Sequence, residues 1–142
     1  MRCAFLLSAL CLLSAVSCAK PDAEEQFIKV RDAENGLYEF TVSLSDSLST
    51  YDFGFYFRAD QFFAGSRQYS IPMDISWISP SSRTALKERV YVCGKGSEGV
   101  RLEYRSGVRI SETGEWKIRV CPRSIPDRFR GLGLTVKRNG TR

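Results

Sequence analysis

The feature that most constrains this fold is the alternation of apolar and polar residues in short runs. Apolar side chains occupy every second position in residues 38–44 (YEFTVSL), 51–58 (YDFGFYFR) and 116–121 (WKIRVC). Side chains alternate between the two faces of a β-strand, so each run predicts a strand with one apolar and one polar face. Antiparallel sheets have this pattern, whereas buried parallel strands are apolar on both faces.

The pattern recurs along most of the chain. We expect strands at residues 38–44, 51–58, 73–77, 83–92, 100–110, 116–121 and 132–137. Turn-forming residues separate them, at 34–36, 45–50, 79–82, 94–99 and 112–114. No stretch has helical periodicity for more than a turn or two. The sequence therefore predicts an all-β fold: an antiparallel β-sandwich, immunoglobulin-like or jelly-roll-like, with seven or eight strands.

Residues 111–116 (SETGEW) resemble the corner that precedes a late strand in immunoglobulin-like sandwiches. There the glycine permits a tight bend and the aromatic residue covers the end of the core. Trp116 stands where tyrosine is usual, so its hydrogen-bond donor would be an indole N–H. We expect a structural role for Trp116, with ligand stacking as the alternative.

The first residues, MRCAFLLSALCLLSAVSC, have the layout of a secretory signal: Arg2, an apolar block at 3–13, then small residues. The block is shorter than the about 20 apolar residues that cross a bilayer as a helix. No later stretch comes near that length. The segment therefore predicts export and not a membrane-spanning helix.

The end of this segment resembles a bacterial lipobox, with Cys18 as the first mature residue. Ala15 and Ser17 are small, as the peptidase requires, although leucine is more usual at position 15. The resemblance implies acylation, including palmitate, and a lipid bilayer as partner through Cys18. Several acyl chains hold a protein firmly, whereas one holds it marginally. Ordinary secretion with cleavage near Ser17, or a signal that is never removed, are the alternatives.

The organisation that follows is a signal peptide at 1–17, a tether at 18–26 and one β-sandwich domain at 27–142. Removal of the signal leaves 142 − 17 = 125 residues, enough for one domain with a real core. Residues 19–25 (AKPDAEE) are polar. The acidic residues Asp22, Glu24 and Glu25 resemble a signal for export to the outer face of the outer membrane. A soluble linker without such a signal is an equally good interpretation.

The formal net charge is +5, and the basic excess lies late in the chain. From residue 117 onward the only acid is Asp127, against Lys117, Arg119, Arg123, Arg128, Arg130, Lys137, Arg138 and Arg142. These cations mostly alternate with apolar residues, which predicts a solvated sheet face. A contact surface for acidic lipid, polysaccharide or a partner protein is the alternative. We expect no nucleic-acid partner, because an envelope protein rarely meets nucleic acid.

Three cysteines remain after removal of the signal: Cys18, Cys93 and Cys121. An oxidising periplasm would permit a disulfide between Cys93 and Cys121. Two free, partly buried thiols are the alternative. They are too few for a metal cage, so we expect no metal.

The chain contains no histidine, which excludes Ser-His-Asp and Cys-His nucleophile pairs. Its acids lie on the polar side of strands or in loops, and no glycine-rich loop precedes a helix. We therefore expect no catalytic residues, no cofactor and no enzymatic activity.

The loop around residues 60–65 (DQFFAG) contains two adjacent aromatic residues, which cannot both face the core of a regular strand. If one is exposed, Phe62 or Phe63 would anchor a partner, with Arg67 and Tyr69 nearby, since aromatics and arginine dominate interface energies. A loop folded over the end of the sandwich is the alternative.

Together these segments resemble the gliding-motility lipoprotein H family over residues 37–138. The resemblance rests on YDFGFYFR at 51–58, IPMDISWISP at 71–80, RSGVRISETGEWKIRV at 105–120 and GLGLTVKR at 131–138. Cys121-Pro122-Arg123 replaces the family's usual Met-Arg, and Trp116 replaces a tyrosine. The resemblance implies an envelope lipoprotein that supports gliding and surface secretion, and it brings no catalytic residues.

The sequence thus predicts a lipid-anchored protein of the bacterial outer membrane, on its periplasmic or its surface face. We expect a structural or accessory interaction role with an envelope protein partner. A surface module that binds glycan or another ligand is the alternative. Aromatic residues open on a concave sheet face would favour that alternative.

Overall fold

The computed structural model describes residues 22–59, 68–95, 100–125 and 128–140. Most of these residues belong to strands. The elements are β1 (Ala23–Lys29), η1 (Val30–Asp32, a 3-10 turn), β2 (Tyr38–Leu44), β3 (Thr50–Ala59), β4 (Gln68–Ile78), β5 (Thr84–Lys95), β6 (Val100–Val108), β7 (Gly114–Pro122) and β8 (Phe129–Asn139). The all-β class and the count of seven or eight strands are confirmed.

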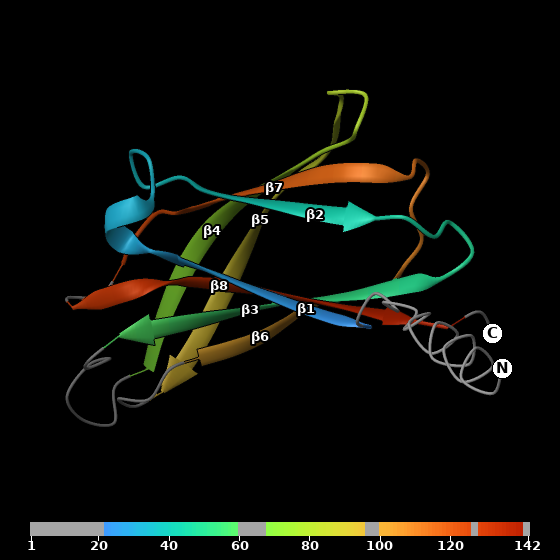
Figure 1. Ribbon diagram of the computed structural model, residues 1–142. Coiled ribbons are helices and arrows are strands. Elements are labelled where there is room, and N and C mark those ends of the chain that lie inside the picture. The colour runs from blue at the N-terminus through green and yellow to red at the C-terminus, as the bar shows by residue number, and fades with distance from the viewer. Residues whose placement is uncertain (1–21, 60–67, 96–99, 126–127, 141–142) are drawn as a thin grey trace, which may run out of the picture.

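The strands form two antiparallel four-stranded sheets, ordered β1-β8-β3-β6 and β2-β7-β4-β5. Figure 1 shows the two sheets facing each other. The pairs β1–β8, β2–β7, β3–β6 and β4–β5 are those of one long hairpin wrapped around a core. Eight strands paired in this way make a jelly roll, one of the two predicted arrangements.

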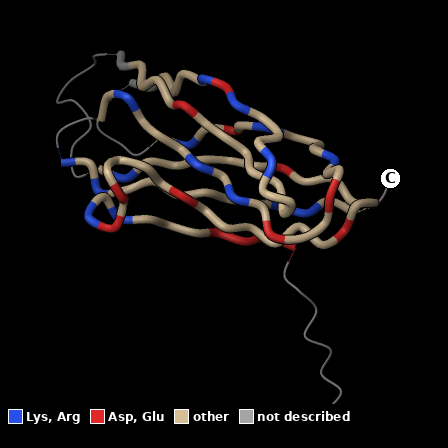
Figure 2. The backbone as a smooth tube through the Cα atoms, turned by 90° about the horizontal axis from the view of Figure 1, so that it is seen from above, with Lys and Arg blue, Asp and Glu red and all other residues tan. Residues whose placement is uncertain are grey.

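The core lies between the sheets and is built by the alternation seen in the sequence. In β2, Tyr38, Phe40, Val42 and Leu44 are buried, while the residues between them are exposed. The opposite sheet contributes an aromatic row from β3, with Phe53, Phe55 and Phe57 almost fully buried. Charged residues of both signs are interspersed over the whole body (Figure 2).

The predicted corner before β7 is confirmed. The Trp116 indole N–H donates a 2.9 Å hydrogen bond to the Glu112 carbonyl, and the ring is 4% exposed. Gly114 has a φ of 134°, and a methyl group there would lie 3.0 Å from Pro80. The bend therefore needs glycine, and Trp116 covers the end of the core.

The predicted tether is too long. The tether was expected to end at residue 26, whereas β1 begins at Ala23 and pairs with β8 through the whole of its length. The sequence of residues 23–26 resembles a linker because β1 is an edge strand whose first three side chains are exposed. Its place in the sheet comes from backbone pairing, which leaves no apolar pattern in those residues.

Gly131 and Gly133 of β8 allow aromatic rings to lie flat on the outer face of the β1-β8-β3-β6 sheet. Gly133 lies opposite both Phe27 of β1 and Tyr56 of β3, whose rings stack with centroids 5.8 Å apart. A methyl group on Gly133 would lie 2.0 Å from carbons of the Tyr56 ring. A side chain at this position would therefore displace the ring.

We predict that Gly133→Ala lowers the free energy of unfolding by about 1–3 kcal/mol, as overpacking does. The Tyr56 ring must move, and its 2.6 Å hydrogen bond to Glu25 is then broken. Urea unfolding of the two proteins measures the difference.

Gly140→Ala is the matched control, because a methyl group there meets nothing within 4 Å. If Gly133→Ala and Gly140→Ala unfold at the same urea concentration, the close packing of Tyr56 on β8 is refuted.

Candidate functional site

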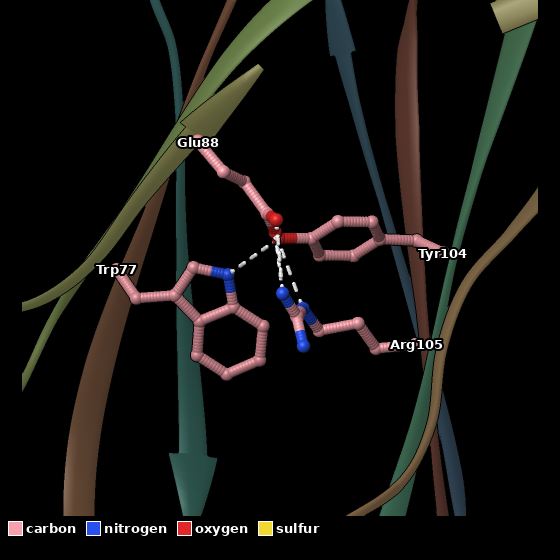
Figure 3. Close-up of polar contacts among 4 residues, drawn as sticks. All are labelled: Trp77, Glu88, Tyr104 and Arg105. Carbon is pink, nitrogen blue, oxygen red and sulfur yellow. Dashed lines mark hydrogen bonds and ion pairs between the residues drawn. The ribbon is translucent and has the colours of Figure 1, made fainter. Parts of the chain in front are cut away.

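A polar cluster of Trp77, Glu88, Tyr104 and Arg105 joins the two sheets through their edge strands β5 and β6 (Figure 3). Glu88 of β5 accepts hydrogen bonds from the Tyr104 hydroxyl and from the Arg105 guanidinium, both of β6. The Arg105 Nη2 to Glu88 Oε2 distance is 2.9 Å. A carboxylate of one sheet is thus held by two side chains of the other.

Trp77 of β4 completes the cluster from the core side. Its indole N–H donates a 3.1 Å hydrogen bond to the Tyr104 hydroxyl oxygen. The Trp77 ring also packs edge-on against Phe53 and Trp116, with centroids 4.6 and 6.2 Å away. The phenol therefore donates to Glu88 and accepts from Trp77, and both of its hydrogen-bonding functions are used.

Burial, followed by the hydrogen bond to Glu88, raises the pKa of Tyr104 to about 12. The phenol therefore remains protonated, and a donor, throughout the physiological range. Arg105 neutralises the charge of Glu88. This arrangement suits a permanent link between the sheet edges, because the Tyr104 phenol does not exchange its proton near neutral pH.

A hollow of about 200 Å³ lies beside the cluster, at the end of the body where β6 finishes. Its apolar lining includes Trp77, Trp116, Leu86, Val108 and Ile110, and Arg105 and Arg109 add positive charge. The volume is below the range of about 300–1,000 Å³ typical of sites for drug-sized ligands. The hollow is large enough for a small ligand that combines an apolar chain with one negatively charged group.

The outer face of the β2-β7-β4-β5 sheet carries ion pairs across its strands. Asp74 of β4 lies 2.6 Å from Arg89 and 2.5 Å from Arg123. These hydrogen bonds, that of Arg89 first, lower the pKa of Asp74 to about 2. Basic residues of the late tract are therefore part of a solvated sheet face here, as predicted.

The neighbouring rows of the same face repeat the arrangement. Glu39 of β2 lies 2.6 Å from Arg119 and 3.4 Å from Lys117, both on β7. The hydrogen bond from Arg119 is the main reason that the pKa of Glu39 is lowered. Such exposed pairs contribute little stability individually, and they leave no unpaired acid on these rows.

The prediction of a disulfide between Cys93 and Cys121 is wrong, and the alternative of two free thiols holds. Cys93 lies opposite Ser70 and Cys121 opposite Asp74, on the two sides of β4. From ordinary strand spacings their Cα atoms are roughly 16 Å apart, whereas a bridge needs less than about 7 Å. Both cysteines do end apparent strands, but those strands are not neighbours.

The predicted site residues are only partly covered by the structure. Cys18, Phe62, Phe63 and Arg67 lie outside the described residues. Tyr69 belongs to β4, opposite Gly94 of β5. Partner contact by this group therefore stays a prediction.

The part of the chain that the structure describes contains neither a metal-ligand cluster nor a membrane-spanning helix. No three His, Cys, Asp or Glu residues come together there as metal ligands would. No helix there is long and apolar enough to span a membrane.

Sequence reasoning missed the Glu88 cluster. The alternation of residues 100–105 (VRLEYR) puts Tyr104 on the apolar side of its strand, but nothing in the sequence pairs it with Glu88. That contact depends on how the edge strands of two separate sheets meet.

We predict that Tyr104→Phe lowers the free energy of unfolding by about 1–3 kcal/mol, because the Trp77 N–H and Glu88 each lose a partner. The variant also changes the pH dependence. In the wild type the pKa of the Tyr104 phenol is about 10 in the unfolded state and about 12 in the folded state. Stability therefore falls across that window.

Urea unfolding at neutral pH and at several values between pH 10 and about 12 tests both effects. The decline should be smaller in Tyr104→Phe, and Tyr91→Phe, at an exposed site on β5, should behave as the wild type does. An unchanged decline in Tyr104→Phe would contradict the assignment.

Comparison with known proteins adds little to this geometry. No protein-family model matches the chain, and no curated protein matches it. A crystal structure of a protein from Sulfurospirillum deleyianum resembles 84% of this chain and 98% of that chain, at 12% sequence identity and a TM-score of 0.45. A likeness of this strength identifies neither a family nor a function.

Proposed function

We propose that this protein is a membrane-anchored envelope lipoprotein whose jelly-roll body acts as a structural or accessory interaction module. The main support is the short distance between Cys18, the expected acylation site, and the first residue of β1, Ala23. Four residues separate them, so their Cα atoms lie at most about 18 Å apart. An acylated Cys18 would thus hold a rigid body close to the bilayer.

Asp22, four residues after the expected acylation site, is firmly joined to the sandwich. The Arg138 backbone N–H donates a 2.7 Å hydrogen bond to the Asp22 carbonyl, and the Arg138 guanidinium lies 2.9 Å from the Asp22 carboxylate. From Ala23 onward β1 is paired with β8, next to the centre of its sheet. A pull on the lipid would therefore act on the whole sheet, as an anchored structural part requires.

We propose a non-enzymatic role, in an outer membrane on either its periplasmic or its surface face. The three acids of the described clusters, Asp74, Glu39 and Glu88, are each neutralised by arginine or lysine. A general acid and a general base need carboxyl groups held in different environments across a cleft. The resemblance to the gliding-motility lipoprotein H family supports a link to gliding or surface secretion, with an envelope protein as partner.

We predict that the wild-type protein incorporates labelled palmitate and partitions into the detergent phase, and that Cys18→Ala does neither. The expected loss is nearly complete, because several acyl chains on one residue supply the membrane affinity. Metabolic labelling followed by detergent phase separation measures both properties.

Cys93→Ala and Cys121→Ala are the matched controls, because both residues are free thiols and should leave labelling unchanged. If the wild type and Cys18→Ala both remain in the aqueous phase, the anchor is refuted.

A second candidate function, binding of a small ligand, is favoured by the hollow beside the Glu88 cluster. Both tryptophans of the chain, Trp77 and Trp116, line it. A ligand that enters must therefore change the environment of at least one indole ring. We predict that such a ligand shifts the intrinsic tryptophan emission of the protein.

Short-chain fatty acids are suitable probes, because they combine an apolar chain with one negative charge that Arg105 or Arg109 could receive. Val108→Phe, which fills the hollow, should abolish the shift. A shift of equal size in Val108→Phe would place the ligand elsewhere, and no shift with any probe would dismiss this function.

A further inference from the structure

A second, strongly basic hollow lies at the other end of the body, where β1 passes into η1 and β8 begins. Its volume is about 480 Å³, within the range of ligand sites. Five cationic residues line it: Lys29, Arg31, Arg58, Arg128 and Arg130. Figure 2 shows several Lys and Arg positions at this end, opposite the C-terminus.

Among the described residues, acidic side chains do little to balance the charge of Lys29, Arg31, Arg58 and Arg128. Asp32 lies 3.8 Å from Arg31, and both side chains are largely exposed. No carboxylate among the described residues forms an ion pair with Lys29, Arg58 or Arg128. This is unlike the outer face of the other sheet, where arginines are paired with Asp74 and Glu39. The hollow therefore keeps a positive potential that favours an anion.

Arg58 is held in place by aromatic rings and not by a carboxylate. Its guanidinium carbon lies 5.6 Å from the ring centroids of both Phe27 and Tyr56. These two rings are stacked at an interplanar angle of 14° over Gly133. A guanidinium stacked on aromatic rings keeps its N–H groups available at its edge, where they can bind a carboxylate or phosphate in a bidentate manner.

Arg128 adds an independent observation, because its backbone is strained. Its φ is 61°, and the other non-glycine residues with positive φ in the described ranges are Asn35 and Ser82. Asparagine enters this left-handed region readily, whereas a residue with a long side chain does so at a cost of about 1 kcal/mol or more. Strain of this kind is concentrated at functional sites, and here it lies on the hollow.

The hollow also has apolar surface between its cations. Phe27 is 36% exposed and Val30 42% exposed, which is unusual for large apolar side chains next to so many charges. A simple inorganic anion would leave this surface uncovered. The combination fits a ligand with negative groups on an otherwise less polar frame.

The hollow lies at the opposite end of the body from Asp22, the residue nearest to the proposed lipid anchor. Asp22 and the C-terminal end of β8 lie at one end of the body, and η1 lies at the other (Figure 1). The seven residues of β1 between them span about 23 Å. Charges on a bilayer are screened within about 8 Å at physiological salt, so a bilayer under the anchored end would not reach this site.

We propose that this hollow binds an anionic glycan, a sugar chain bearing carboxylate or phosphate groups. Arg58, Lys29 and Arg128 bind the negative groups, and Phe27 and Val30 contact the apolar faces of the sugar rings. The choice of an envelope polymer rests on the proposed lipoprotein function, whereas the binding site itself does not. A concave hollow fits one chain segment better than it fits the broad surface of a protein partner.

The test is a calorimetric titration of the full-length protein in neutral detergent with a short oligosaccharide of uronic acids. The wild type should bind it, with an affinity that falls as salt is added, and should not bind a neutral oligosaccharide of the same length. Arg58→Met, which retains an apolar stem over the rings, should weaken binding about fivefold or more.

Arg128→Asn keeps a residue that tolerates the left-handed backbone, so it removes the charge without harming the fold. It should also weaken binding about fivefold or more. Arg83→Gln is the matched control, an exposed arginine in the β4–β5 turn, and should bind as the wild type does.

Two kinds of result would overturn the proposal. One is absence of binding by the wild type, or equal weakening in Arg83→Gln, which would indicate unspecific attraction of charge. The other is binding of soluble short-chain phosphatidylglycerol, lost in Arg58→Met, without binding of the oligosaccharide, which would assign the hollow to a lipid headgroup. Acylation of Cys18 does not enter these titrations, so a failed anchor test and a failed glycan test remain distinguishable.

Discussion

The structure depends on one constraint: each strand has a single apolar face, and only the apolar face of the opposite sheet is available to cover it. Full burial of a large apolar side chain contributes about 1.5–3 kcal/mol, and the rows of β2 and β3 supply many such residues. A sandwich satisfies the constraint at its centre but leaves its two long edges open. Polar side chains close them. On one edge Glu88 joins β5 to β6, and on the other the Gln26 side-chain amide donates a 2.7 Å hydrogen bond to the Thr41 carbonyl, joining β1 to β2.

Some elements of this fold can be predicted from the sequence and others cannot. The strands β2, β3, β6 and β7 are readable because one of their faces is buried, and burial produces the period of two. β1 is not readable, since its first three side chains are exposed and it is held mainly by backbone pairing with β8. The corner at Trp116 was predictable because its contacts are local in the chain. The Glu88 cluster and the distance between Cys93 and Cys121 were not, because both depend on strand order, which side-chain periodicity does not contain.

The same reasoning explains where function can reside. Within the sandwich the side chains are committed to the core, and on the outer face of the β2-β7-β4-β5 sheet Asp74 and Glu39 are each paired with two cationic side chains. What remains are the ends of the body, where strands stop and neither restriction holds. One end offers an apolar hollow lined by two indole rings, and the other offers a hollow lined by cations. The glycines of β8 connect core and surface: they let Phe27 and Tyr56 lie flat on the sheet, and those rings in turn hold Arg58.

The opposite character of the two ends has a mechanical consequence for an anchored protein. Asp22, Glu24 and Glu25 begin the body and lie close to the expected lipid, whereas the cationic hollow lies a full strand length away. A bilayer with anionic headgroups would attract the cationic end, so a body on a loose tether would tend to lie down on the membrane. A tether of four residues, fixed to β8 through Asp22, limits that motion. Because β1 begins at Ala23, the tether proposed here is shorter than the one predicted from sequence, and a short tether favours an upright body that presents its basic end away from the membrane.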